Sequence, residues 1–381
     1  MYREYFPQLR GAYLASHTLG PMPRTAQEAL EAYARAWSER GVRAWAEGWW
    51  EAPREASREL SQLLGVDPQG ISFHPHATAA LASLLSSLRF QPPRNRILTT
   101  ELEFSSILYQ LQAWEAYGAE VVCLPADEGK FPWERFEASL DERVLLVVVS
   151  HAAYRTSERV DLQRIAELCH RVGTQLAVDA YQTAGVLPLE MRRFADYVFG
   201  GGVKWLLSGP GAGYLWVRES WWEEWPRLVG WAGHARPFAF EREWVPAPGG
   251  ERYGVGTPNV APLLVARAGY QLLLEVGLDT IWDHVRRLAR TLIEGAQRLG
   301  VELVGPPQAE ARSGTVILKL PYGYAAELNR REVVCDWRPG AGVRLGLHFF
   351  TLPSEIEMVL GAIEEIRQEG TWRQHEPGRV T

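Results

Sequence analysis

The segment Gln175-Leu-Ala-Val-Asp-Ala-Tyr-Gln-Thr-Ala-Gly185 carries a short apolar run that stops at an acid, Asp179. Neither this run nor Val144–Val149 upstream alternates between apolar and polar residues. Such runs are typical of strands in a parallel sheet whose two faces are both covered by helices. The segment therefore predicts an α/β fold in which a mainly parallel central sheet is flanked by helices.

The spacing of apolar residues around this segment predicts alternating strands and helices, followed by a second group of elements. We predict an N-terminal arm over 1–23, a large α/β domain over 24–260 and a smaller α+β domain over 261–381. A short strand and turn are predicted over 70–78, and the other predicted strands are 96–100, 119–124, 144–149, 175–179, 196–200, 213–218, 301–304 and 315–320. The predicted helices are 24–47, 52–64, 78–88, 105–117, 132–138, 161–172, 263–276, 281–299 and 353–368.

Composition excludes several classes of protein. Hydrophobic residues make up 46% of the 381 residues, which is enough for a substantial core. A net charge of −6 without a basic stripe argues against nucleic acid, and the three cysteines form no Cys-x-x-Cys pair that would suggest disulfides or zinc. The longest apolar stretch is too short to cross a bilayer, and the first residues lack the apolar run of a signal peptide. We expect a cytoplasmic protein without membrane or metal partners.

Lysine is rare in this chain, and one lysine follows a glycine run. Only Lys130, Lys204 and Lys319 occur among 40 basic residues, and arginine cannot replace lysine where a nucleophilic amine is needed. Lys204 comes 25 residues after Asp179, in Gly200-Gly-Gly-Val-Lys-Trp205. Pyridoxal phosphate (PLP) needs both residue types: an acid that keeps its pyridine nitrogen protonated and a lysine that forms a Schiff base. We therefore predict PLP as the cofactor, with Lys204 and Asp179 as catalytic residues.

Other residues allow a functional and a structural interpretation. Ala77 and Thr78, in the Pro75-His-Ala-Thr turn, could seat a phosphate at a helix start, although an ordinary N-cap fits equally well. Phe104 could stack on the pyridine ring or belong to the core. Arg344 could bind a substrate carboxylate or lie on the surface. His74 and His76 have no third ligand at suitable spacing, so we predict no metal site.

The chain resembles the class V, fold-type I PLP enzymes, and among them it is most similar to the kynureninases. The resemblance covers nearly the whole chain. Four segments carry it: Tyr13-Leu-Ala-Ser-His-Thr-Leu-Gly20 is similar to that family's YLDGNSLG, Gly230-Trp-Ala-Gly-His234 to its GWxGH, Gly254-Val-Gly-Thr-Pro-Asn259 to its CGTxP, and Val334-Cys-Asp-Trp-Arg338 with Arg344 to its VCDxR…IR.

The resemblance implies a role for each matching residue. Lys204 would carry PLP, Asp179 would pair with its pyridine nitrogen, and Phe104 would stack on its ring. Phosphate would be bound by Ala77, Thr78, Trp231 and, from a neighbouring subunit, Thr257, while Gln182 stands at a cofactor-binding position. His234 would hold the aromatic end of the substrate and Arg344 its carboxylate. The family is homodimeric, with active sites shared across the interface.

The chain also departs from the family pattern. Kynureninases usually carry Tyr immediately before the lysine, where it contacts phosphate and assists proton transfer, and a hydroxyl residue before that Tyr. Here the two positions are Val203 and Gly202. The family's Asp-x-x-His is Asp179-Ala-Tyr-Gln182, whose Gln is similar to that of cysteine desulfurases, but no thiol follows His348 as a desulfurase requires.

These observations leave three hypotheses. The first is hydrolysis of kynurenine or 3-hydroxykynurenine to alanine and an anthranilate, as in tryptophan catabolism. The second is another reaction of a class V enzyme on an amino acid: transamination, racemisation or β-elimination. The third is a binding protein that keeps the PLP fold but catalyses little.

Overall fold

The computed structural model describes residues 2–376, and its centre is a seven-stranded sheet. The strand order is β2-β8-β7-β6-β5-β3-β4, and β8 alone runs against the other strands. This is the mainly parallel sheet that the apolar runs predict. The strands are β2 (Ile71–His74), β3 (Arg96–Thr100), β4 (Glu120–Leu124), β5 (Val144–Ser150), β6 (Gln175–Asp179), β7 (Tyr197–Gly201) and β8 (Gly213–Val217).

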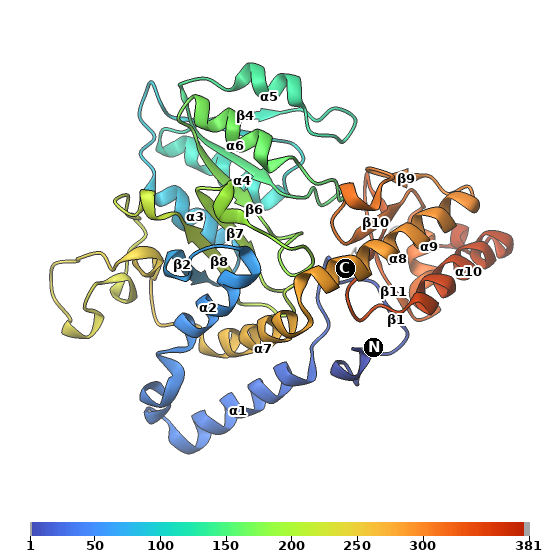
Figure 1. Ribbon diagram of the computed structural model, residues 1–381, viewed down its shortest axis with the longest axis horizontal. Helices are drawn as coiled ribbons and strands as arrows, with labels where there is room; N and C mark the ends of the chain where they lie inside the picture. Colours follow the sequence, from blue (N-terminus) through green and yellow to red (C-terminus); the bar gives the residue numbers. More distant parts are fainter. Residues whose placement is uncertain (1, 377–381) are drawn as a thin grey trace.

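Helices cover both faces of this sheet (Figure 1). Their ends follow local sequence signals. In α6 the Asp161 side chain caps the helix by accepting from the Arg164 N–H at 3.0 Å, and α2 ends at Gly65, whose φ of 64° suits glycine. The helices of this part are α1 (Arg24–Arg40), α2 (Ala52–Leu64), α3 (Ala77–Ser87), α4 (Ser105–Ala113), α5 (Trp133–Ser139), α6 (Leu162–Arg171) and α7 (Val260–Val276).

A smaller α+β unit lies beside the large one, at the right of Figure 1. Its four-stranded antiparallel sheet has the order β12-β13-β10-β9. The N-terminal arm reaches this unit, because β1 (Ala12–Tyr13) pairs in parallel with β11 (Val333–Val334). The other elements are α8 (Leu278–Arg298), β9 (Leu303–Val304), β10 (Thr315–Leu318), α9 (Tyr322–Arg330), β12 (Asp336–Arg338), β13 (Gly342–Gly346) and α10 (Pro353–Glu369).

The helix α7 packs against α1 and α2 of the large unit (Figure 1). The predicted boundary at 260/261 stays a proposal, and this packing favours a start of the small domain at α8. Within residues 2–376, no single helix is long and apolar enough to cross a membrane. Only α7 and α8 taken together have the length and composition for it, and they are bent by 79° against each other.

The predicted α/β class with a smaller α+β part is confirmed, and several elements differ in detail. The predicted helix 24–47 ends at Arg40, because Gly41 leaves helical geometry, and a short π-helical turn follows at Trp45–Trp49. The helix α9, which is short and contains Gly323, was not predicted from the sequence. That glycine lies directly under the backbone of Trp372, where a Cβ would be 1.8 Å from the carbonyl oxygen.

Candidate active site

Asp179 and Lys204 meet at the carboxyl edge of the parallel strands. Asp179 ends β6 and is buried, and its Oδ1 accepts the backbone N–H of Tyr181 at 2.8 Å. Lys204 follows β7, and its Nζ lies 4.0 Å from the centroid of the Tyr181 ring. Burial raises the pKa of Asp179 and lowers the pKa of Lys204, while the charge of each residue opposes the shift of the other. Among residues 2–376, Lys204 forms no ion pair, so its amine is free for chemistry.

A second acid lies behind Asp179. Ser150 is the neighbour of Asp179 in the register of β5 and β6. The Ser150 hydroxyl donates to the buried carboxyl of Glu103 at 2.5 Å, and Thr100 donates to the other oxygen of Glu103 at 3.3 Å. Burial raises the pKa of Glu103 to about 8. Glu103 is therefore protonated at neutral pH and leaves Asp179 as the ionised member of this network.

The start of α3 offers backbone donors above Gly213, the register neighbour of Gly201 in the lysine segment. His76 caps the helix, because its Nδ1 accepts the Ala79 N–H at 3.1 Å. The N–H groups of Ala77 and Thr78, in the first turn, have no acceptor within the helix, and both residues are partly exposed. Such a helix start favours a phosphate group.

Phe104 stands at the start of α4 with 44% of its surface exposed. Its ring meets Tyr154 edge to face, with the centroids 5.2 Å apart. An exposed aromatic ring at this position can pack against a flat ligand. The free amine, the buried acid, the helix start and this ring together fit pyridoxal phosphate.

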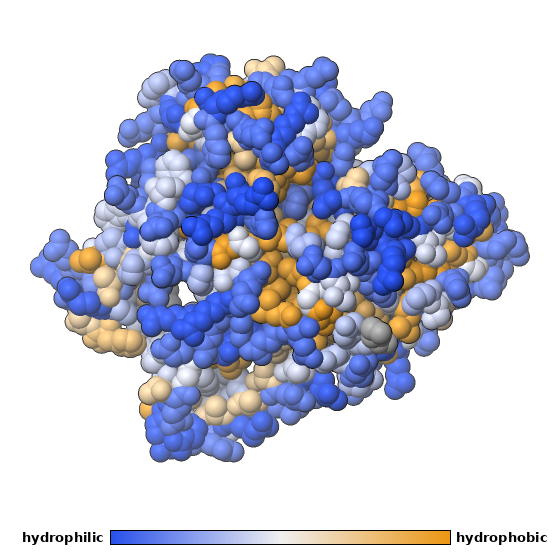
Figure 2. Space-filling model, viewed as in Figure 1, coloured by the Kyte–Doolittle hydropathy of each residue, from blue (hydrophilic) through white to orange (hydrophobic). Residues whose placement is uncertain are grey.

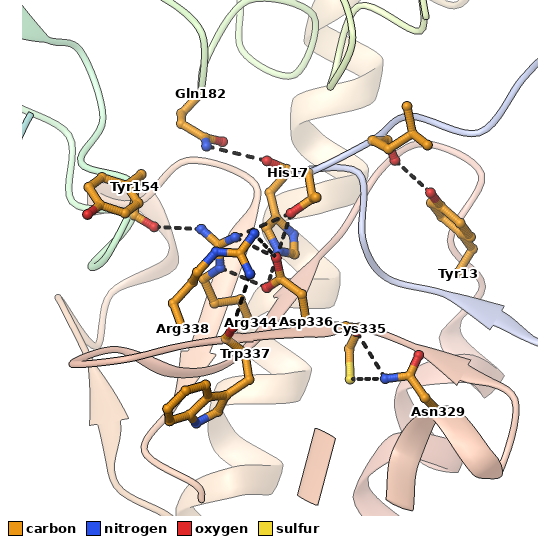
Figure 3. A network of polar contacts seen from close by, with 12 residues as sticks. Tyr13, His17, Tyr154, Gln182, Asn329, Cys335, Asp336, Trp337, Arg338 and Arg344 are labelled. Atoms are coloured by element: carbon orange, nitrogen blue, oxygen red, sulfur yellow. Dashed lines mark hydrogen bonds and ion pairs between the residues drawn. The ribbon is translucent and has the colours of Figure 1, made fainter. Parts of the chain in front are cut away.

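Arg344 lies on β13 and is held by an acid of the neighbouring strand (Figure 3). Its Nε and Nη2 donate to the two carboxylate oxygens of Asp336 at 2.8 and 2.6 Å, and its Nη1 donates to the Tyr154 carbonyl at 3.0 Å. Arg338 lies 3.3 Å from the same carboxylate and is partly exposed. Arg344 is thus buried in an ion pair rather than lying on the surface.

Residues of the N-terminal arm complete this cluster (Figure 3). His17 Nε2 and Thr18 Oγ1 contact Asp336 at 2.9 and 2.6 Å. Burial and the nearby Arg344 lower the pKa of His17 to about 4, so His17 is neutral at pH 7. Burial would raise the pKa of Asp336, but His17 and Arg344 outweigh this effect and hold it well below its usual range.

The side chain of Gln182 is engaged by protein groups. Its Oε1 accepts the Trp205 indole N–H at 3.0 Å, and its Nε2 donates to the His17 carbonyl at 3.4 Å. Gln182 thus joins the lysine segment to the N-terminal arm. A contact with the cofactor stays a prediction.

Trp231, His234 and Thr257 lie apart from the other predicted residues, on the segment between β8 and α7. Trp231 packs edge to face on Trp50, with centroids 5.9 Å apart, and Thr257 is exposed. Both ring nitrogens of His234 are engaged within the same segment, by the Arg236 N–H and the Glu243 carbonyl. Within the described chain the structure records no contact of these three residues with Lys204 or Asp179, so their roles stay predictions.

Four residues that contact or surround Asp179, Lys204 and Arg344 were not predicted as site residues from the sequence: His17, Glu103, Tyr181 and Asp336. Asp336 lies inside the VCDxR-like segment, which was a usable signal. Glu103 precedes Phe104 and looks like a solvated acid in the sequence, although it is 3% exposed.

Comparisons with known proteins agree with a site for pyridoxal phosphate. A family model described as "Aminotransferase class-V" matches residues 12–359. The chain is 28% identical over 373 residues to the "Uncharacterized aminotransferase YcbU" of Bacillus subtilis (strain 168), covering 96% of each chain. It is 27% identical over 384 residues to a kynureninase of Pseudomonas fluorescens, covering 95% of this chain and 90% of that protein.

Solved structures share the fold. A cysteine desulfurase from Thermococcus onnurineus superposes with a TM-score of 0.84 at 21% identity, covering 94% of this chain and 95% of the other. A variant of C-DES with glycine covalently linked to its PLP cofactor gives a TM-score of 0.86 at 23% identity, covering 95% and 98%.

Proposed function

Because the chain belongs to the class-V aminotransferase family and is a PLP-dependent enzyme acting on amino acids, we propose that it hydrolyses kynurenine or 3-hydroxykynurenine. Water and substrate would give alanine and anthranilate or 3-hydroxyanthranilate, by cleavage between Cβ and Cγ. The observation that carries the enzymatic part is the free amine of Lys204 beside the buried acid Asp179. The similarity to several kynureninases and the Gly230-Trp-Ala-Gly-His234 segment support the substrate.

The residues around Lys204 and Asp179 would each have a separate role. Bound PLP supplies an electron-accepting ring that weakens the bonds at the substrate α-carbon. Asp179 would hold a proton at the pyridine nitrogen of the cofactor, and protonated Glu103 behind it avoids a second negative charge. The Lys204 amine, whose pKa is lowered by burial, takes the proton from the α-carbon. Ala77 and Thr78 would donate backbone N–H groups to the phosphate of the cofactor.

The charge of the arginine cluster suits a single substrate carboxylate. The two guanidinium charges of Arg344 and Arg338, set against the one charge of Asp336, leave one positive charge, since His17 is neutral. Asp336 occupies one edge of the Arg344 guanidinium. The Nη1 and Nη2 end donates to the Tyr154 carbonyl and the Thr18 hydroxyl, and the substrate carboxylate would take the place of these acceptors there.

A second copy of this chain would complete the site in a homodimer. Apolar side chains are exposed on α1 and on the segment between β8 and α7, including Trp37 (62%), Phe240 (78%) and Val255 (50%). Figure 2 shows apolar residues on this segment at the left of the view. Monomers rarely leave such surfaces uncovered. The proposal places Thr257 of one copy, and with it Trp231 and His234, in the site of the other.

Subunit mixing tests the shared site. The Lys204→Ala and Thr257→Ala variants are each assayed alone and after co-refolding in equal amounts. If residues of two subunits form each site, mixing restores about a quarter of the wild-type activity, because half of the dimers are mixed and each of these has one intact site. No recovery over the sum of the two variants would place both residues in the same subunit. A chain with both substitutions is the control.

The similarity to YcbU favours a second candidate, transamination or a related reaction on another amino acid. It would use the same Lys204 and Asp179. The departures at Val203 and Gln182 fall where kynureninases carry Tyr and His, which is the specific reason to keep this candidate.

Product analysis decides between the candidates. The PLP-loaded protein is incubated with kynurenine and with 3-hydroxykynurenine, and alanine and anthranilates are quantified by mass spectrometry. Equimolar alanine and anthranilate, absent with Lys204→Ala, is the expected result. Pyruvate, an exchanged α-proton or a new oxoacid from other amino acids would establish the second candidate. Turnover of no amino acid despite bound PLP would favour a binding protein.

A further inference from the structure

Tyr181 lies between the two residues on which the chemistry depends. Its backbone N–H donates to Asp179 at 2.8 Å, and its ring face lies 4.0 Å below the Lys204 amine. A cation on a tyrosine face at this distance is attracted by the ring quadrupole. The two contacts hold the backbone of Tyr181 to Asp179 and its ring to Lys204.

The glycine run before Lys204 leaves space for this ring. A Cβ on Gly201 would lie 2.8 Å from Cε2 and 2.9 Å from both Cζ and Oη of Tyr181. The phenol end of Tyr181 therefore fills the volume that a side chain at position 201 would need. Likewise, a Cβ on Gly202 would lie 2.4 Å from the Ser208 hydroxyl. The hydroxyl groups of Tyr181 and Ser208 thus lie beside Gly201 and Gly202, two positions of the lysine segment that carry no side chain.

The phenol end also lies on the same face of the sheet as the start of α3. Gly201 is the register neighbour of Gly213 on β8. A Cβ on Gly213 would lie 2.5 to 2.8 Å from the backbone of His76, the residue that caps α3. Each member of the series Tyr181, Gly201, Gly213 and α3 is therefore a neighbour of the next. The first N–H groups of α3 lie at the end of the series opposite to Tyr181.

The hydroxyl of Tyr181 is suited to donate a proton in a hydrogen bond. Burial raises the pKa of Tyr181 to about 12, so the phenol stays protonated at neutral pH. Among the described residues the structure records no hydrogen-bond partner for it. Val203, immediately before the lysine, has no hydroxyl with which to serve the same region.

We propose that Tyr181 is an active-site residue with two roles: its ring stabilises the ammonium form of Lys204, and its hydroxyl donates to the phosphate of the cofactor. It supplies, from the turn that follows strand β6, the phenol that the segment before Lys204 lacks. The proposal rests on the fit of PLP to the site and not on kynurenine as substrate.

The ring role is tested in the protein without cofactor. The chain has three lysines, so competitive labelling with acetic anhydride at a series of pH values, read by mass spectrometry of peptides, gives each lysine its own titration curve. Tyr181→Leu should lower the titration midpoint of Lys204 by about half a pH unit, and Tyr181→Phe should leave it within error. Lys130 and Lys319 serve as internal references for intact structure. An unchanged Lys204 midpoint in Tyr181→Leu would overturn the ring role.

The hydroxyl role is tested by binding of two ligands that differ only in the phosphate. Tyr181→Phe should weaken the binding of pyridoxal phosphate about tenfold, the effect of one hydrogen bond to a charged group, and leave the binding of pyridoxal unchanged. Equal losses for both ligands, or no loss for either, would overturn it. These measurements need no turnover, so their outcome does not depend on whether the protein hydrolyses kynurenine.

Discussion

The carboxylate of Asp336 accepts two parallel hydrogen bonds from the guanidinium of Arg344, at 2.8 and 2.6 Å, while both side chains are at most 4% exposed. A buried pair of this kind orients the arginine, but it also leaves an uncompensated charge when one partner is removed. The expected position of the substrate carboxylate depends on this orientation.

Asp336→Asn should therefore impair both stability and substrate binding. Removing one partner of a buried pair typically lowers the free energy of unfolding by about 3–5 kcal/mol. Urea unfolding of the apo protein measures this, and Glu302→Gln is the matched control: it breaks the exposed pair with Lys319 and should cost less than about 1 kcal/mol. The KM for an amino acid substrate should rise in Asp336→Asn. An unchanged KM would show that Arg344 needs no orientation by Asp336.

Glu103→Gln should change how stability depends on pH. Glu103 has a folded-state pKa of about 8, against an ordinary value of 4.5. Between these values the unfolded chain has lost the proton and the folded chain keeps it, so the free energy of unfolding falls as pH rises. The glutamine variant lacks this slope and should gain stability relative to the wild type from pH 5 to pH 8, by up to a few kcal/mol.

The difference between Glu103→Gln and the wild type isolates this residue. Asp179, whose pKa is also raised, contributes a slope of the same sign to both proteins, and the lowered pKa of Lys204 contributes the opposite sign at higher pH. Glu101→Gln, two residues away and exposed, is the control and should show a constant difference. A constant difference for Glu103→Gln as well would mean that Glu103 is ionised in the folded protein.

Arg312 joins the two units of the chain through hydrogen bonds to backbone carbonyls. It is 0% exposed, and its guanidinium donates to the carbonyls of Val304, Pro306 and Thr315 in the small unit and Thr156 in the large one. Lysine cannot reproduce this planar set of donors. Arg312→Lys should lower the free energy of unfolding by about 2–4 kcal/mol, since buried carbonyls lose their donors. Arg298→Lys, on the exposed end of α8, is the control. Equal unfolding midpoints for the two variants would contradict the assignment.

The sequence predicted the sheet well because buried parallel strands are local apolar runs. The strands β3 and β6 have the same bounds as the predicted strands 96–100 and 175–179. Lys204 and Asp179 could be paired because strand ends of a parallel sheet share an edge. What the sequence could not show depends on distant parts of the chain. The Asp336 pair is completed by His17, 319 residues away, and the acidity of Glu103 depends on its burial.

Tyr181 is the clearest example of such a distant dependence. In the sequence it is one aromatic residue between Asp179 and Gln182. Its importance comes from Gly201, whose missing side chain leaves room for the ring. No local pattern connects the two positions, since the glycine run by itself indicates only close packing.

Gly201→Ala should therefore displace Tyr181 without removing it. The new Cβ would lie within 2.9 Å of three atoms of the phenol end, so the ring must leave its present position, in which its face contacts the Lys204 amine. We expect the variant to shift the Lys204 titration midpoint downward, as Tyr181→Leu does, and to weaken pyridoxal phosphate binding more than pyridoxal binding. Adding Gly201→Ala to Tyr181→Leu should change the Lys204 midpoint no further, because the same contact is already lost. Gly361→Ala, in α10 with nothing within 4 Å of its Cβ, is the control for the added methyl group. A Lys204 midpoint in Gly201→Ala equal to that of the wild type would show that the ring keeps its place on the amine, and that the space over Gly201 does not determine where Tyr181 lies.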